Sequence, residues 1–254
     1  MLKKILAIVV ISVLVSMANL VNAETPKPGG SINVVIQPEP PGLMLGLVQN
    51  GPTQMVAGNI YEGLLRYDND LKPMPSLATN WEITEGGTVY TFNLKKGVTW
   101  HDGKPMTAAD VVFTAKEFLP EGHPRWRVTK TNVTKIEALD DHTVRFTLKQ
   151  PFGPFLGAFE VGSMPIIPKH IYAGTDFKNN PANNHPIGTG PFKFNEWKKG
   201  SYIHLVKNKD YHIDGQPYLD EIFWHVIPDA AARAVAIETD KVDVLVPGSI
   251  EYWD

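Results

Sequence analysis

Hydrophobic and polar residues alternate in two seven-residue stretches, "TVYTFNL" (88–94) and "HTVRFTL" (142–148). Such alternation is typical of strands that bury one face. The apolar positions are Tyr90, Phe92 and Leu94 in the first stretch and Val144, Phe146 and Leu148 in the second. Asp140 and Asp141 lie between the stretches and predict a hairpin turn. Further strands are expected at 31–37, 201–208 and 241–246.

Three other stretches favour helices. Apolar residues at Val56, Ile60 and Leu64 recur every four positions and predict a helix within 53–68. Another is expected from Asp229, the predicted N-cap residue, to about Thr239. The third lies within 107–118 and is treated below. Strand–helix–strand units mixed with hairpins predict an α/β, or mixed α+β, architecture.

The stretch "VTWHDGKPMTAADVVFTAKEF" (98–118) has two interpretations. Its His, Asp, Lys and Thr suggest a catalytic cluster, but neighbouring residues on an extended chain point to opposite faces, so His101 and Asp102 are poorly placed as base and orienting acid. The alternative is a turn at "DGKP" followed by a helix that Thr107 caps, with Asp110 at the third helical position. We favour this structural interpretation and expect Pro120 to end the helix.

The first 23 residues have the organisation of a secretory signal peptide. "MLKK" is basic, 5–15 is an uninterrupted apolar run, and "VNA" offers a cleavage site after Ala23. A membrane anchor is the alternative, but polar residues interrupt the longer run that spanning would need. We therefore expect an exported chain that begins at Glu24.

Composition limits the classes of function. Removal of 1–23 leaves 231 of the 254 residues and changes the net charge from −3 to −5, because Lys3 and Lys4 are lost. That acidity, without a dense basic run, argues against a nucleic-acid partner. The chain has no cysteine, which excludes disulfides, thiolate chemistry and a lipid-modified cysteine. We expect a periplasmic protein without a lipid anchor.

Motifs for metals and phosphates are weak. No two of the eight histidines are closer than eight residues, so a paired-histidine metal motif is missing and no metal or cofactor is expected. "IGTGPFKF" (187–194) contains GxG, but Lys193 replaces the third glycine of a dinucleotide loop.

Six segments in order resemble one family. They are "NIYEGLLRYD", "PSLATNWEIT", "TFNLKKGVTWHDGKPMTAADVVFT", "HTVRFTLKQPFGPFL", "PIGTGPFKFNEWKKG" and "VKNKDYHIDGQPYLDEI". The chain resembles the family 5 extracellular solute-binding proteins of ABC importers, the dipeptide-, oligopeptide- and nickel-binding type, over almost all of residues 30–246.

The resemblance implies a periplasmic binding protein-like fold of type II (cluster C). It implies a first lobe of two subdomains, one from 24–62 and 186–254 and the other from 63–185. It also implies a second lobe that is absent or truncated here, which would weaken ligand binding by this chain alone.

By the same resemblance, three segments face the ligand: 38–44, 121–129 and 157–165. The ligand-binding residues expected from them are Glu39, Met44, Arg125, Trp126, Arg127 and Glu160. Trp126 offers an aromatic face between two arginines that can bind a carboxylate. The alternative left open is a tryptophan packed against its own lobe between solvated arginines.

The leading hypothesis is a substrate-binding protein that is not an enzyme. Its expected partners are a small solute, for which a peptide is one candidate, and the membrane subunits of an ABC permease. The alternatives are a secreted hydrolase with an unrecognised site and a remnant without a transport role.

Overall fold

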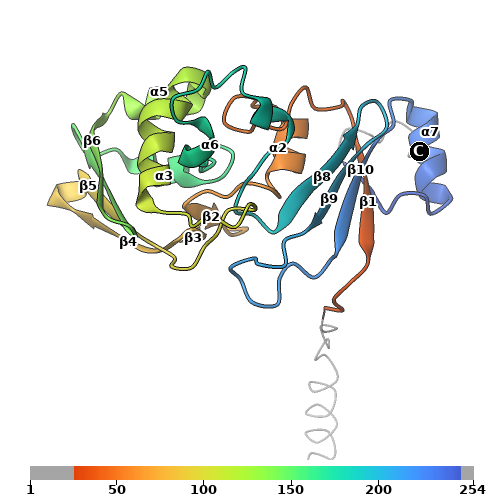
Figure 1. Ribbon diagram of the computed structural model, residues 1–254, viewed down its shortest axis with the longest axis horizontal. Helices are drawn as coiled ribbons and strands as arrows, with labels where there is room; N and C mark the ends of the chain where they lie inside the picture. The colour runs from red at the N-terminus through yellow and green to blue at the C-terminus, as the bar shows by residue number, and fades with distance from the viewer. Residues whose placement is uncertain (1–25, 247–254) are drawn as a thin grey trace, which may run out of the picture.

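A mixed five-stranded sheet unites segments from both ends of the described chain. The computed structural model describes residues 26–246; the expected signal peptide (1–23) and residues 247–254 of the expected first subdomain lie outside the described residues. The strands are β1 (Ser31–Ile36), β8 (Phe192–Lys198), β9 (Tyr202–Lys207), β10 (Glu221–Val226) and β11 (Val244–Leu245). Their order is β11-β1-β10-β9-β8, with β1 parallel to β10 and β11 and the remaining pairs antiparallel (Figure 1).

A four-stranded antiparallel sheet forms the other side of the molecule (Figure 1). In order, its strands are β4 (Ala78–Thr84), β5 (Val89–Leu94), β7 (Thr143–Leu148) and β6 (Val133–Asp140). The predicted alternation is confirmed, because the apolar residues of β5 and β7 named above are all buried. The predicted turn after Asp140 is confirmed too, and the Asp140 carboxylate accepts a hydrogen bond from the His142 amide at 2.7 Å.

A long helical segment covers the buried face of this sheet (Figure 1). It consists of α3 (Ala108–Phe113), the π-helical η2 (Thr114–Phe118), α4 (Leu119–Gly122) and α5 (Pro124–Lys130). The prediction that Pro120 ends the helix is wrong, because the chain stays helical to Gly122. The π-turn accommodates the proline: the Leu119 amide donates to Thr114 O, five residues back, instead of to Ala115 O.

The predicted helix within 53–68 is confirmed only as far as Ala57, and the prediction is wrong for the residues that follow. Helix α2 spans Gly51–Ala57, and the chain then turns into β2 (Leu65–Tyr67), which pairs with β3 (Pro73–Pro75). Close packing explains the break. A Cβ on Gly63 would collide with Phe159 O and lie 2.8 Å from Val161 N, so this backbone runs directly against 159–161.

The remaining helices are short, except α7 (Ala230–Glu238) beside β1 (Figure 1). The predicted N-cap is confirmed, because the Asp229 carboxylate accepts from the Ala232 amide at 2.7 Å. The others are η1 (Glu85–Gly87), η3 (Gly153–Phe159), α6 (Lys169–Tyr172) and η4 (Pro181–Asn184). One continuous apolar core connects the two sheets, and a small cluster of Val35, Ala236 and Val242 lies under α7.

Candidate functional site

The segment Gly188–Gly190, just before β8, packs by backbone contact against the turns that follow α2 and β5. The Gly190 amide donates to Ile60 O at 2.9 Å, and the His101 amide donates to Gly188 O at 2.9 Å. A Cβ on Gly188 would collide with Ile60 O, and one on Gly190 would lie 2.7 Å from Asn59 O. The glycines of this GxG therefore serve close backbone packing and leave no open loop for a phosphate.

His101 completes this junction as a neutral imidazole. Its Nδ1 accepts from the Gly188 amide at 3.3 Å, and its Nε2 lies 2.9 Å from Gly190 O, where it donates. Burial lowers the pKa of His101 to about 4. Asp102 pairs instead with His170, with Nε2 and Oδ2 2.7 Å apart. The adjacent His101 and Asp102 thus have separate structural partners, as the non-catalytic interpretation requires.

Within the stretch 98–118, the Asp110 carboxylate also has a structural role, because it accepts hydrogen bonds from two backbone amides. Its Oδ2 accepts from the Thr107 amide at 2.9 Å, and its Oδ1 accepts from the Lys169 amide at 2.9 Å. The helix begins after Thr107, as predicted, and Thr107 and Asp110 form the predicted capping box. The carboxylate of Asp110 is what ties α3 to α6.

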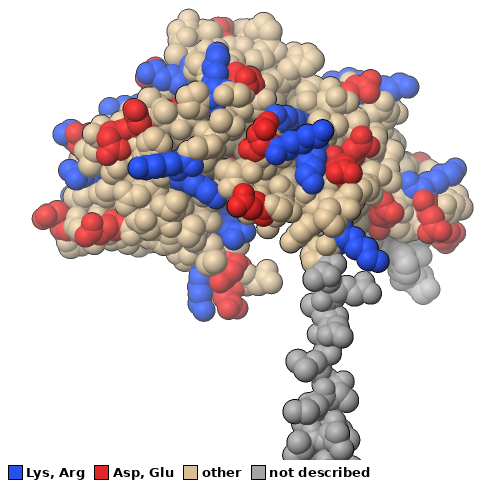
Figure 2. Space-filling view, turned by 60° about the horizontal axis from the view of Figure 1, so that its bottom comes forward, with Lys and Arg blue, Asp and Glu red and all other residues tan. Residues whose placement is uncertain are grey.

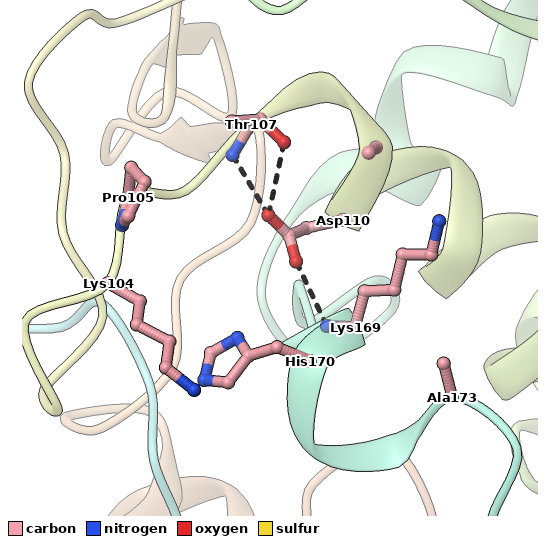
Figure 3. A pocket seen from close by; sticks show the side chains of 8 residues that line it. Lys104, Pro105, Thr107, Asp110, Lys169, His170 and Ala173 are labelled. Atoms are coloured by element: carbon pink, nitrogen blue, oxygen red, sulfur yellow. Dashed lines mark hydrogen bonds between the residues drawn. The ribbon is translucent and has the colours of Figure 1, made fainter.

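A cavity of about 480 Å³ opens beside Asp110. Lys104, Lys169 and His170 line it, which suggests an anion site. Figure 3 shows the Lys169 ammonium pointing away from Lys104 and His170, so the three basic groups do not converge on one point. Figure 2 likewise shows basic and acidic side chains interspersed over the face it displays.

Of the three segments expected to face a ligand, the second (121–129) and the third (157–165) contact each other. His123 Nε2 donates to Gly162 O at 3.2 Å, which joins the second segment to the third. A Cβ on Gly122 would collide with Leu47 Cδ2 and lie 3.1 Å from Gly46 O, so the second segment also packs against residues that follow the first. Gln49, in that same loop, has a buried amide without a hydrogen-bond partner among the described residues. We name the surface of the loop 44–50, the helical turns 121–127 and the segment 157–165 the three-loop face; its first member lies just beyond the expected segment 38–44.

Trp126 is a core residue, which corrects the expectation of an exposed ligand platform. Its side chain is 0% exposed and packs edge-on against Phe146 and Phe159. Its Nε1 donates at 2.8 Å to Ala115 O, the carbonyl that the π-turn frees. The alternative left open, a tryptophan packed within its own lobe, is the one observed. Arg125 and Arg127 are exposed on α5.

Glu39 and Met44 are occupied by contacts within the protein. Glu39 Oε1 accepts from Trp197 Nε1 at 2.8 Å and from the Gly200 amide at 3.0 Å, so it fastens the β8–β9 turn. Met44 is 2% exposed, with its sulfur 3.7 Å from the Tyr61 hydroxyl. Glu39 is thus engaged through Oε1 and Met44 is buried, so both side chains have roles within the protein in place of the expected ligand contacts.

Glu160 lies in a second cavity of about 480 Å³, which we name the junction pocket. Its lining combines the end of α2, the β2–β3 hairpin and the third segment; the residues are Gly58, Tyr61, Glu62, Gly63, Leu65, Arg66, Tyr67, Leu71, Ser76, Glu160, Val161, Pro191 and Tyr211. Sequence reasoning missed all of these except Glu160. No local motif marks them, because they come from distant parts of the chain.

Glu62 forms one buried wall of the junction pocket and is fully engaged. It is 8% exposed, and His212 Nε2 lies 3.0 and 2.9 Å from its two oxygens. The hydroxyls of Tyr211 and Thr189 donate to Oε1 and Oε2 at 3.0 and 2.9 Å. These bonds meet the requirement that a buried carboxylate be paired and hydrogen-bonded, so Glu62 holds Tyr211 in place and is not open to a ligand.

Two classes of site or segment are not found in the part of the chain that the structure describes. Residues 26–246 contain no group of three or more His, Asp or Glu side chains that could hold a metal ion. Within the same residues, every helix is too short or too polar to cross a bilayer.

The sequence matches one family model and several bacterial binding proteins. A family model described as "Bacterial extracellular solute-binding proteins, family 5 Middle" matches residues 72–254. The oligopeptide-binding protein AppA of Bacillus subtilis (strain 168) is 38% identical over 198 residues, which are 76% of this chain and 36% of the relative. The glutathione-binding protein GsiB of Pectobacterium atrosepticum is 32% identical over 199 residues, covering 77% and 38% of the two chains.

The fold is also similar to those of solved binding proteins. The structure of AppA from Bacillus subtilis in complex with a nonapeptide superposes with a TM-score of 0.81 and 35% identity, over 89% of this chain and 45% of that one. The binding protein DppA from Helicobacter pylori in complex with peptide STSA gives 0.77 and 32%, over 87% and 47%. The chain thus spans less than half the length of these relatives.

Proposed function

The chain belongs to the bacterial extracellular solute-binding proteins of family 5, and we propose that it forms one wall of a cleft that captures a peptide-like solute for an ABC importer. The observation that carries the proposal is the convergence of the three loops, which pack against one another through Gly122, His123 and Gly162. Clustered loops on a rigid scaffold are where proteins commonly place binding groups.

A peptide-like solute is favoured by the relatives, because AppA and DppA were solved with peptides and GsiB is named for glutathione, a tripeptide. On the three-loop face, Arg125 and Arg127 remain the proposed contacts for a ligand carboxylate, and Glu160 the proposed contact for an amine. We further propose export through cleavage after Ala23, a periplasmic location, a permease as membrane partner and no enzymatic activity.

The proposed organisation is two subdomains, 24–62 with 186–254 and 63–185. Membership of the sheets supports it: the five-stranded sheet takes strands from 31–36 and 192–245, whereas the four-stranded sheet takes all of its strands from 78–148.

A titration followed by NMR tests capture even when affinity is low. The ¹⁵N-labelled protein is titrated with Ala-Phe and with a nonapeptide up to millimolar concentration. We expect saturable shifts of amides in the three-loop face, with those of β6 as internal controls. Absence of saturable shifts with both peptides, or hydrolysis of either, would overturn the proposal.

A further inference from the structure

The junction pocket holds two charged side chains that no described residue neutralises. Arg66 donates from Nε to Pro75 O at 3.2 Å, and its terminal nitrogens have no carboxylate within 4.0 Å among residues 26–246. Glu160 accepts from the Gly162 amide at 2.6 Å through Oε2, and among the same residues Oε1 has no hydrogen-bond partner. The two side chains do not form an ion pair with each other. One cation and one anion are therefore left available in a single cavity.

Aromatic and apolar groups surround these charges. Tyr67 is half-buried, and burial followed by the nearby Glu160 carboxylate raises its pKa. Its hydroxyl therefore stays protonated, and it makes no hydrogen bond to another described residue. Tyr211 is held by Glu62, while Leu65, Val161 and Pro191 contribute apolar surface. Such a mixture of apolar walls and a few polar groups, in a volume of about 480 Å³, is typical of small-ligand sites.

One residue at the rim of the junction pocket, Leu71, has an unfavourable backbone conformation. Leu71, at the tip of the β2–β3 hairpin, has a φ of 60° and is 79% exposed. A left-handed conformation is unfavourable for a residue with a Cβ, and such strain concentrates at functional sites. The Asp68 carboxylate holds the turn by accepting from the amides of Asp70 and Lys72 at 2.9 and 2.8 Å. The hairpin thus keeps an exposed leucine beside the cavity.

We propose that the junction pocket binds a zwitterion of amino-acid or dipeptide size, with its ammonium group on Glu160 and its carboxylate on Arg66. Tyr67 donates a further hydrogen bond to the ligand, and Leu71 covers the ligand's apolar side chain. This inference rests on the proposed function and extends it: the pocket shares Glu160 and Val161 with the three-loop face, so the two sites adjoin.

Charge-blocked ligands test the two assignments separately. Affinities of the wild type, Glu160→Gln and Arg66→Gln are measured by NMR titration with Ala-Phe, N-acetyl-Ala-Phe and Ala-Phe amide. A hydrogen bond to a charged group corresponds to about tenfold or more in affinity. We expect Glu160→Gln to weaken Ala-Phe about tenfold and to leave N-acetyl-Ala-Phe unchanged. We expect Arg66→Gln to weaken Ala-Phe similarly and to leave Ala-Phe amide unchanged.

Matched controls separate a binding role from a structural one. Glu117→Gln and Lys178→Gln remove exposed charges elsewhere and should bind all three ligands as the wild type does. Thermal unfolding confirms that each variant is folded at the titration temperature. Shifts of the three-loop face with Ala-Phe, combined with unaltered affinity in both pocket variants, would overturn this inference and the assignment of the amine contact to Glu160, and would leave capture on the three-loop face standing. No shifts with any peptide would overturn both.

Discussion

The imidazole of His123 bridges Trp126 and Gly162: its Nδ1 accepts from the Trp126 amide at 3.3 Å while its Nε2 donates to Gly162 O at 3.2 Å. One ring therefore caps α5 and joins two loops of the three-loop face. The arrangement requires a neutral ring, because a proton on Nδ1 would oppose the amide of Trp126. Burial accordingly lowers the pKa of His123 to about 4.

This geometry predicts loss of stability in mild acid. The pKa of His123 is about 4 in the folded state and about 6.5 when unfolded, so protons bind preferentially to the unfolded chain between these values. Stability is therefore complete above pH 6.5 and falls as the pH decreases, by up to about 1.4 kcal/mol per pH unit for each such histidine. His101 adds to this in the same range.

Urea unfolding of the wild type and of His123→Gln at pH 7, 6 and 5 measures this dependence. The variant should lose less stability between pH 7 and 5 than the wild type, whatever its stability at pH 7. His185→Gln, which alters an exposed ring, should retain the wild-type slope. Equal slopes for all three proteins would contradict the prediction.

The burial of Trp126 predicts a stability defect. Trp126→Phe leaves a cavity and removes the donor to Ala115 O, so we expect a loss of about 2 kcal/mol in the free energy of unfolding. Arg127→Ala changes an exposed neighbour and should stay within about 0.5 kcal/mol of the wild type. Urea midpoints measure both, and an unchanged midpoint for Trp126→Phe would show that the indole is not needed there.

Gly188 is expected to tolerate no side chain. Gly188→Ala places a methyl group against Ile60 O, which cannot yield without moving the backbone of the turn that follows α2. We expect a loss of about 3 kcal/mol or more, or failure to fold. Gly157→Ala is the matched control, because its Cβ meets no atom within 4 Å and should change stability little. Circular dichroism with urea titration distinguishes the two; similar stabilities would refute the close-packing explanation.

Asp110 should matter more than Thr107. Asp110→Ala leaves the amides of Thr107 and Lys169 without their charged acceptor, for an expected loss of about 3 kcal/mol. Thr107→Ala should cost about 1 kcal/mol at most. Lys169→Met keeps the backbone amide that Asp110 binds and should be nearly neutral. Unfolding midpoints of the three variants measure the order, and a larger effect of Thr107→Ala would contradict it.

The local pattern of residues was sufficient to predict several strands and helices. Alternation along 88–94 and 142–148 predicted β5 and β7, and Asp229 marked the start of α7. These predictions succeed because each depends on neighbours within a few residues, whose spacing and capping chemistry the sequence displays directly. The contact between 121–129 and 157–165 was expected only through resemblance to a family, which placed the first segment at 38–44 and not at 44–50.

Tertiary structure alone decided the roles of most site residues. The indole of Trp126 faces the core, where it donates a hydrogen bond to the Ala115 carbonyl that the π-turn leaves free. Glu39 accepts a hydrogen bond from Trp197, which is 158 residues away in the sequence. The junction pocket likewise joins Tyr211 to Glu62 across 149 residues and places Arg66 and Glu160 in one cavity. Sequence spacing carries no information on such contacts, because they form only when packing of the core brings separate segments together.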